Sequence, residues 1–394
     1  MESYLINSLN KLRTNYYAEL NLVIGNESCD LDSAVAAIVY AAFLDWQYEK
    51  IKCCKVCTRF SRDETAYKDS IYIPVLNVER DDFPLKTEVV SCLKEAGITR
   101  ENLVFRDDFN LEEIVTKSST KVTIVDHHTL AKKDVFLTPF VTEIIDHRPL
   151  DKSQWAYKDD TRTTTEIVGS CCTLITQRIK DLSALVATEM DFLNNFKICS
   201  DMLHSTIILD TVNFSKEVDK ATPHDVDMVT FLEAALNPTD IETVRKKKLD
   251  RLVAARSDVT SLNAAQLLRK DVKVFDDILV PSFPILVKEF LTRPGAIEAI
   301  SVALKSRGCS LALLLGMNLD GGLQRDMAAW SFDHDKSQRL CDLLLSWRPS
   351  LDLLGDELPD KSASKFKEVR YYTQQNLRAS RKQYIPAVMK FLNK

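Results

Sequence analysis

The sequence predicts an α/β protein of two domains, the first of which is built on a parallel sheet. Short apolar runs of strand length alternate with longer segments of helical character in the first half of the chain. This alternation is typical of a parallel sheet with helices on both faces. The chain has 394 residues, which is more than an average single domain contains.

The strands of the first domain are predicted from apolar runs whose length is that of a buried strand. Helical segments separate most of these runs. A further helix begins after Gly169 and Ser170 and continues to about Lys180. The predicted strands are residues 20–25, 71–78, 121–125 and 141–145, and the first two predicted helices are residues 32–44 and 86–96.

The pattern changes after residue 236, where Asn237 and Pro238 indicate a turn. Residues 240–256 follow as a charged helical segment, and we expect the hinge directly after it. Further strands are predicted at residues 272–275 and 310–315. The predicted domains are therefore residues 1–256 and 257–394.

Composition and charge exclude several classes of protein. The net charge of −5 provides no overall basic field for nucleic acid or membrane, and no apolar run is long enough to span a bilayer. Ten cysteines without a secretory signal indicate free thiols in a reducing compartment. We expect the cytoplasm, with the mitochondrial matrix as the alternative. The CxxC formed by Cys54 and Cys57 lacks two further zinc ligands nearby.

Acidic and histidine side chains follow the predicted strands. Residues 25–32 contain two aspartates, residues 126–128 read Asp-His-His, and residues 146–148 read Asp-His-Arg. Residues 207–209 are interpreted as another short strand, which ends at Asp210. Because the carboxyl ends of parallel strands meet at one edge of a sheet, these side chains are expected to converge there.

This set of residues predicts a site for divalent metal ions. Carboxylate oxygens suit hard cations, and imidazole adds affinity for Mn²⁺, Co²⁺ or Zn²⁺. Two ions about 3.5–4 Å apart can activate a water and clamp the attacking and leaving oxygens of a phosphoryl transfer. A single aspartate after a strand is more often a helix cap. The metal hypothesis therefore depends on all four motifs together.

The motifs also carry a resemblance to a known family. GNESCDLDS, PVLNVER, TIVDHH, IIDHRP, EIVGSCCTLIT and STIILDTVN occur in this order, followed by KATPHD and LLRKDVKVF. With them the chain resembles the DHH phosphoesterase superfamily, in the branch that carries a DHHA2 domain. That branch includes family II inorganic pyrophosphatases, yeast-type exopolyphosphatases and the animal prune proteins, and the chain resembles an insect prune protein. The resemblance implies a C-terminal DHHA2 domain with a mixed sheet and an active site in the cleft between the domains.

The resemblance further implies two divalent ions, Mg²⁺ or Mn²⁺, with Co²⁺ as the alternative. One aspartate of the first motif binds each ion, and the aspartate of the second motif bridges them. Asn26 stands where the pyrophosphatases have a histidine, and an amide oxygen is a weaker ligand than imidazole, so we expect a looser first site that favours Mg²⁺. The implied metal ligands are Asn26, Asp30, Asp32, Asp126, His147 and Asp210.

Catalytic and substrate-binding roles are implied in the same way. Arg148 replaces a histidine of the family and suits bidentate binding of phosphate. Besides the bridging Asp126, the neighbouring His127 and His128 are expected to support it or to protonate the leaving group. For two of the basic residues, at 381 and 382, a solvated helix end is the alternative. The implied substrate-binding residues are Arg80, Arg148, Lys273, Arg381 and Lys382.

The sequence leaves three functions open. The first is hydrolysis of short-chain polyphosphate, and the second is hydrolysis of the cyclic nucleotides cAMP or cGMP by the same ions. The third is a weakly active or inactive binding protein, since the resemblance implies nucleoside diphosphate kinase as a partner. An intact acidic cluster favours an enzyme over a scaffold, because such a cluster is costly to keep. Neither stable binding of nucleic acid nor a membrane partner is expected.

Overall fold

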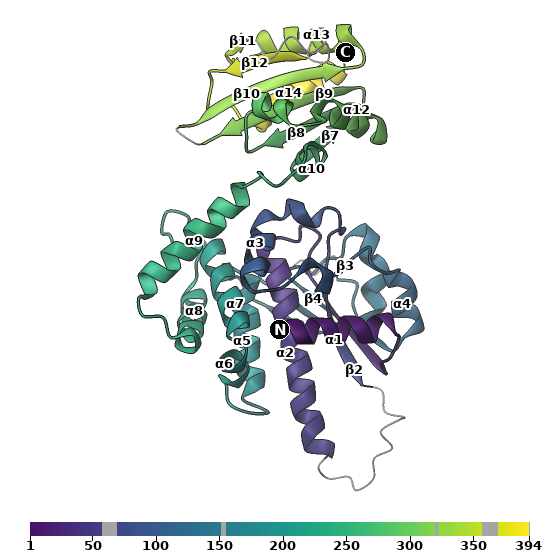
Figure 1. Ribbon diagram of the computed structural model, residues 1–394, viewed down its shortest axis with the longest axis vertical. Coiled ribbons are helices and arrows are strands. Elements are labelled where there is room, and N and C mark those ends of the chain that lie inside the picture. Colours follow the sequence, from purple (N-terminus) through teal and green to yellow (C-terminus); the bar gives the residue numbers. More distant parts are fainter. Residues whose placement is uncertain (57–68, 151–154, 320–321, 357–368, 394) are drawn as a thin grey trace. The chain divides into compact units, whose positions relative to one another are not determined.

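The computed structural model describes residues 1–56, 69–150, 155–319, 322–356 and 369–393. The chain divides into two compact units, Met1–Arg256 and Ser257–Lys394, each with its own sheet (Figure 1). The predicted α/β class is confirmed, because the first sheet is parallel throughout and the second is mixed. The Cys54–Cys57 pair lies outside the side chains that the structure describes.

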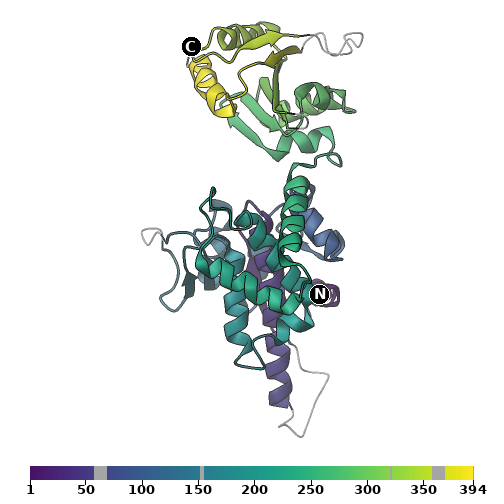
Figure 2. The same cartoon turned by 90° about the vertical axis from the view of Figure 1, so that its left-hand side faces the viewer.

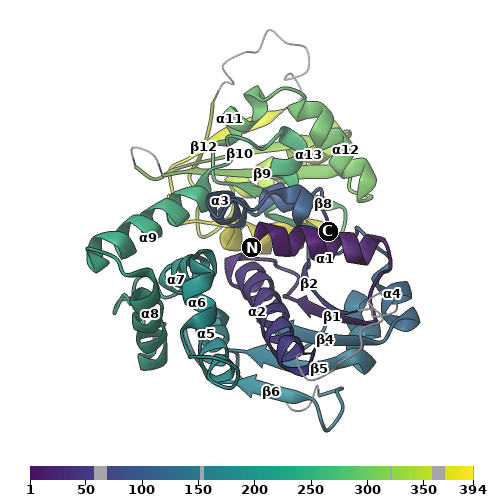
Figure 3. The same cartoon turned by 60° about the horizontal axis from the view of Figure 1, so that its bottom comes forward.

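The parallel sheet of the first unit has the strand order β3-β2-β1-β4-β5-β6. Figure 3 shows most of these strands side by side, with α2 along one face. The direction in which the chain adds strands reverses between β1 and β4, and open α/β sheets bind ligands outside the carboxyl ends at such a switch point. The strands are β1 Glu19–Ile24, β2 Ser70–Leu76, β3 Val104–Phe105, β4 Thr120–Val125, β5 Val141–Asp146 and β6 Arg162–Thr165.

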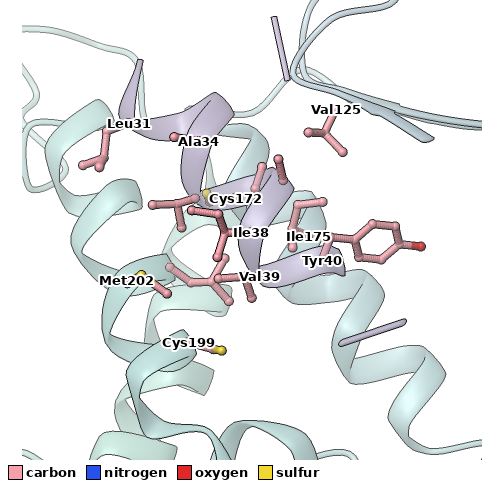
Figure 4. Packing of buried hydrophobic residues seen from close by; sticks show 14 of the residues in the cluster. Leu31, Ala34, Ile38, Val39, Tyr40, Val125, Cys172, Ile175, Cys199 and Met202 are labelled. Atoms are coloured by element: carbon pink, nitrogen blue, oxygen red, sulfur yellow. The ribbon is translucent and has the colours of Figure 1, made fainter. Parts of the chain in front are cut away.

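Helices cover both faces of this sheet, and α2 is central to the core. Ala-, Val- and Ile-rich residues 34–43 of α2 are buried on every side. They pack against the sheet and against α5 and α7, where Ile175 and Met202 meet Ile38 and Val39 (Figure 4). The helices are α1 Glu2–Arg13, α2 Leu31–Val56, α3 Thr87–Glu95, α4 Leu111–Lys117, α5 Cys171–Ser183, α6 Asp191–Asn195, α7 Lys197–Asp210, α8 Pro223–Leu236 and α9 Ile241–Ser257, with 3-10 turns η1 Phe83–Leu85, η2 Arg100–Asn102 and η3 Lys132–Phe140.

The second unit is a mixed sheet of order β11-β12-β10-β9-β8-β7. Leu311 and Leu313 of β9 pack against α13 and the C-terminal α14, which is yellow in Figure 2. The alternate residues of β9 face the opposite side, where α11 and α12 contact the strand. Its elements are α10 Ala264–Lys270, β7 Val272–Phe275, β8 Ile278–Phe283, α11 Val287–Thr292, α12 Ala296–Ser306, β9 Leu311–Asn318, β10 Gln324–Ser331, α13 His334–Leu345, β11 Leu353–Gly355, β12 Arg370–Gln374 and α14 Arg381–Leu392.

One predicted element is wrong. The apolar residues 207–209 do not form a strand but the last turn of helix α7, whose final residue is Asp210. A run of three apolar residues fits a buried helix as well as a strand, and only the length of the surrounding element distinguishes the two. Asp210 is therefore presented by the C-terminal end of a helix. Among the described residues, no helix is long and apolar enough to cross a membrane.

A buried polar network joins α7, α8 and α9 within the first unit. His204 Nδ1 lies 3.0 Å from the Lys248 ammonium and its Nε2 lies 3.0 Å from Glu233. Glu233 also accepts two hydrogen bonds from Arg245, and Lys248 pairs with Asp201 at 2.6 Å. Since Lys248 can only donate, Nδ1 must accept, and the histidine is held in its neutral form.

The network makes stability depend on pH. Burial, and then the charge of Lys248, lower the pKa of His204 from 6.5 to about 4. The unfolded chain therefore takes up a proton first, so this stabilisation is complete above pH 6.5 and is lost as the pH falls towards 4. We expect the free energy of unfolding in urea to fall by on the order of 2 kcal/mol from about pH 7 to about pH 5 through this group. His204→Gln should show a correspondingly smaller fall, and an unchanged pH dependence in that variant would contradict the assignment.

Candidate metal centre

Three predicted residues from three segments meet at the carboxyl edge of the parallel sheet. One ligand atom each of Asp32, Asp126 and His147 lies within 4.8 Å of the other two. His147 Nε2 lies 3.3 Å from Asp126 Oδ1 and 3.9 Å from Asp32 Oδ2. This is the one group of its kind among the described residues, and it lies where β1, β4 and β5 end.

Asp126 is positioned by the backbone that leaves β4. Its φ of 60° is in the left-handed region, which costs a non-glycine residue about 1–3 kcal/mol and is found mainly at functional sites. The backbone N–H still donates to Ile145 at 2.8 Å. Oδ2 accepts hydrogen bonds from Asn26 Nδ2 and Ser33 Oγ, both at 2.8 Å. Oδ1 is buried and faces two cationic side chains, His147 at 3.3 Å and Arg148 at 3.0 Å, so it lies where a metal cation could also bind.

Asp32 is clamped by the N-terminal end of α5. Its Oδ1 accepts from the Ser170 hydroxyl at 2.8 Å and from the Cys172 N–H at 2.9 Å, and its Oδ2 accepts from the Cys171 N–H at 2.7 Å. These buried donors hold the carboxylate in one orientation while Oδ2 keeps a lone pair on the side of His147. The predicted helix end therefore binds a carboxylate of the protein itself.

His147 is oriented by a backbone carbonyl. Its Nδ1 donates to Val168 O at 2.9 Å, which directs Nε2 at the two aspartates. A histidine whose second nitrogen is held in this way is typical of metal ligands. The remaining predicted ligand, Asp210, lies close enough for the charges of Asp32, Asp30 and Asp126 to act on it, and its Oδ2 is buried without a hydrogen-bond partner.

Asn26 is placed differently from the prediction that its oxygen binds a metal. Its NH₂ group donates to Asp126, and its oxygen accepts from the N–H and the hydroxyl of Ser28 at 2.9 and 2.6 Å. In this arrangement Asn26 orients Asp126. Asp30 caps α2, since its Oδ1 accepts from the Ser33 N–H at 3.1 Å. Ser33 was not predicted, although its place one residue after the DLD motif on the first turn of a helix was a usable signal.

The electrostatics of the group favour a cation. Burial, and then the charge of Asp32, raise the pKa of Asp126 to about 6. Burial and the same carboxylate raise the pKa of Asp210 well above its usual value. Burial lowers the pKa of His147, but the hydrogen bond to Asp126 and the charge of Asp32 outweigh it and raise the value to about 9. Clustered negative charge is thus only partly neutralised by the protein, and the donor set of carboxylates and imidazole fits Mg²⁺ or Mn²⁺.

A divalent ion should therefore stabilise the first unit. At about 100 times its dissociation constant, an ion that binds only the folded chain adds about 2.7 kcal/mol. We expect Mn²⁺ to raise the Tm of metal-free protein in differential scanning fluorimetry. The shift should disappear in His147→Gln and persist in His224→Gln, because His224, on α8, pairs with Glu166 outside the group. An equal shift in both variants would contradict the site.

The other histidines and the arginine of the motifs surround the group. His128 Nδ1 lies 2.5 Å from Asp146 Oδ2, and His127 Nδ1 donates to Val125 O at 2.9 Å. Burial lowers the pKa of His127. The Arg148 guanidinium lies 3.0 Å from Asp126 Oδ1 and 3.2 Å from Asp146 Oδ1, with 45% of its side chain exposed. Arg148 is therefore the cation of this motif set that both touches the group and reaches solvent.

Arg80 is held away from such a role. Its guanidinium forms two hydrogen bonds of 2.6 Å with Asp108 and donates to the carbonyls of Arg100 and Leu103. All three of its nitrogens thereby connect the loop after β2 to the segments on both sides of β3. Arg80 is therefore left out of the substrate-binding residues that we propose below.

The basic residues predicted in the second unit lie near one corner of its sheet. Arg381, on the first turn of α14, pairs with Asp271 at 2.7 Å, directly before β7. Lys273 is exposed on β7, the edge strand, and Lys382 is exposed beside Arg381. Arg381 is thus partly engaged, while the two lysines project into solvent.

Comparisons with known proteins agree with this architecture. Residues 21–209 match the DHH family N-terminal domain, and residues 250–391 match the DHHA2 domain. Together they define a DHH protein that carries a DHHA2 domain. Exopolyphosphatase PRUNE1 of Rattus norvegicus is 31% identical over 400 residues, which cover all of this chain and 79% of the relative. The chain therefore belongs to the prune family of DHH/DHHA2 proteins.

Other relatives extend the comparison. Exopolyphosphatase PRUNE1 of Homo sapiens is 28% identical over 95% of this chain and 76% of its own length. Among solved structures, a candidate family II inorganic pyrophosphatase of Methanococcus jannaschii is 17% identical, covering 95% of this chain and 100% of its own. The TM-score of this match is 0.46.

Proposed function

We propose that this protein is a metal-dependent phosphoesterase that hydrolyses short-chain inorganic polyphosphate. The observation that supports this most is the group of Asp32, Asp126 and His147 at the switch point of a parallel sheet. Its relatives of the prune family are named exopolyphosphatases. The substrate class is carried over from them.

The residues of the site have separate proposed roles in binding metal, binding phosphate and transferring a proton. Asp32, Asp126 and His147 would hold a divalent ion, with Asp210 and Asp30 beside them for a second. Such ions supply Lewis-acid stabilisation of phosphoryl oxygens and lower the pKa of water. Arg148 orients the terminal phosphate through its planar pair of donors. His128, whose Nδ1 is held by Asp146, keeps Nε2 available to pass a proton to the leaving phosphate oxygen.

The second unit has a proposed part in the same reaction. As the family resemblance implies, Lys273, Arg381 and Lys382 would neutralise the distal phosphates of the substrate. We assign the DHH domain to residues 1–256 and the DHHA2 domain to residues 257–394. Polyphosphate carries a charge on every phosphate, so a net-acidic chain needs such local cations to bind it.

The test is a comparison of substrates. We expect release of phosphate from tripolyphosphate in Mg²⁺ or Mn²⁺, measured colorimetrically, with cAMP and cGMP in parallel reactions. Turnover of the cyclic nucleotides but not of tripolyphosphate would replace the proposed substrate with a phosphodiester. An inert protein with every metal and substrate would favour the binding-protein alternative, with nucleoside diphosphate kinase as the partner to test.

Arg148 provides a sharper prediction for phosphate binding. Replacing Arg148 with glutamine should raise KM for tripolyphosphate about 10–100-fold, because a charge-assisted hydrogen bond is worth about 1.5–3 kcal/mol. Arg148→Lys should recover only part of this, since lysine cannot bind bidentately. Arg162→Gln is the control, because Arg162 pairs with Glu143 on β5 and is 62% exposed. An unchanged KM in Arg148→Gln would remove this residue from the substrate site.

A further inference from the structure

The five residues Val168–Cys172, which precede and begin α5, contact two of the candidate metal ligands and the chain neighbour of a third. The Val168 carbonyl orients His147, and Ser170, Cys171 and Cys172 together donate three hydrogen bonds to Asp32. Gly169 lies against Thr211, the residue after Asp210, since a Cβ at Gly169 would lie 2.6 Å from Thr211 Cγ2. We call residues 168–172 the template segment.

The template segment is itself held from behind by a buried carboxylate on another helix. Asp225, on the first turn of α8, is fully buried. Its Oδ2 accepts from the Gly169 N–H at 2.8 Å, and its Oδ1 accepts from the Thr173 hydroxyl at 2.5 Å. Oδ2 also accepts from the N–H and hydroxyl of Thr222 at 2.7 and 2.8 Å, which closes the capping box of α8.

We propose that Asp225 is a positioning residue for the metal centre, acting through the template segment on Asp32 and His147. This inference rests on the proposed metal site of the enzyme. Asp225 does not contact that group of ligands. It fixes Gly169 and Thr173, on either side of the three donors to Asp32.

The Asp225 carboxylate can do this because both of its oxygens accept hydrogen bonds. An ionised carboxylate accepts on both oxygens, whereas an asparagine amide has one oxygen and an NH₂ group that cannot accept. With its oxygen kept on the Gly169 N–H, Asp225→Asn turns its NH₂ group towards Thr173, whose hydroxyl can then no longer donate to residue 225 and must reorient. The start of α5 can then shift, and its three donors to Asp32 move with it. Loss of partners beyond the ligands themselves typically weakens metal binding about 10–100-fold.

The test measures metal affinity rather than activity. Binding of Mn²⁺ to metal-free full-length protein is followed by electron paramagnetic resonance of the free ion. We expect Asp225→Asn to weaken Mn²⁺ binding at least about 10-fold. Thr173→Val should weaken it to a smaller degree, and Thr173→Ser, which restores the hydroxyl, should recover wild-type affinity. This pair keeps the inference testable where Asp225→Asn does not fold.

The matched control is Glu233→Gln. Glu233 lies on the same helix as Asp225, is buried, and pairs with Arg245 and His204. The Glu233→Gln substitution should lower the Tm without changing the affinity for Mn²⁺. Wild-type affinity in folded Asp225→Asn, or an equal loss in Glu233→Gln, would overturn the inference.

The outcome for wild type separates this inference from the proposed function. Wild-type protein that binds Mn²⁺ but hydrolyses no phosphate compound overturns only the proposed function. Wild-type protein that binds no Mn²⁺ overturns both.

Discussion

Replacing Asp126 with asparagine is expected to abolish hydrolysis of tripolyphosphate, lowering kcat at least about 1,000-fold, which corresponds to about 4 kcal/mol. The Asp126 carboxylate uses Oδ2 to accept from Asn26 and Ser33 and leaves Oδ1 for a cation. An asparagine can keep its oxygen on the two donors, but then its NH₂ group faces His147. The fold should survive while the bridging ligand is lost.

The measurement is phosphate release at saturating Mg²⁺ or Mn²⁺, with Mn²⁺ binding measured in parallel. Asp134→Asn is a suitable control, because Asp134 is equally buried in the same unit but pairs with Arg106 at 3.1 Å. The Asp134→Asn variant should be less stable than wild type and should retain most of its kcat. Near-normal hydrolysis by Asp126→Asn would exclude this aspartate as the bridging ligand.

Replacing Asp32 with alanine should destabilise the metal-free protein by about 3 kcal/mol. The three buried donors of α5 would lose their acceptor, and a buried donor left without a partner costs about 1–3 kcal/mol, offset in part by water that enters the cavity. Urea unfolding in EDTA separates this effect from the loss of the ion.

Asp30→Ala is the matched comparison for Asp32→Ala. Asp30 caps α2 through the Ser33 N–H in a more exposed position, so its loss should cost about 1 kcal/mol. Equal destabilisation by the two variants would contradict the clamp that α5 forms on Asp32.

The DHH-type motifs could be predicted because each is local in sequence. An apolar run followed by Asp or His indicates the carboxyl end of a strand, and parallel strands bring such ends together. Asp32, Asp126 and His147 were found in this way, and the structure brings them into one group. The α/β class followed from the same alternation of strands and helices.

Residues 207–209, predicted as a strand, show what a local sequence pattern cannot distinguish. Residues 207–209 are as apolar as a buried strand, but they continue a helix of 14 residues that begins at Lys197. Propensity and periodicity do not separate these cases over three residues. Packing of α7 against α2 and α8 decides it.

The sequence by itself determined the class of fold, three residues of the candidate metal group and the edge of the sheet at which they meet. Only the tertiary structure decided which atoms of those residues face one another. Asn26 directs its NH₂ group rather than its oxygen at Asp126, Arg80 is engaged by Asp108, and Asp225 supports Asp32 through α5. The reason is physical: a polar side chain turns towards the partner that satisfies its hydrogen bonds. At these positions that partner comes from a distant part of the chain.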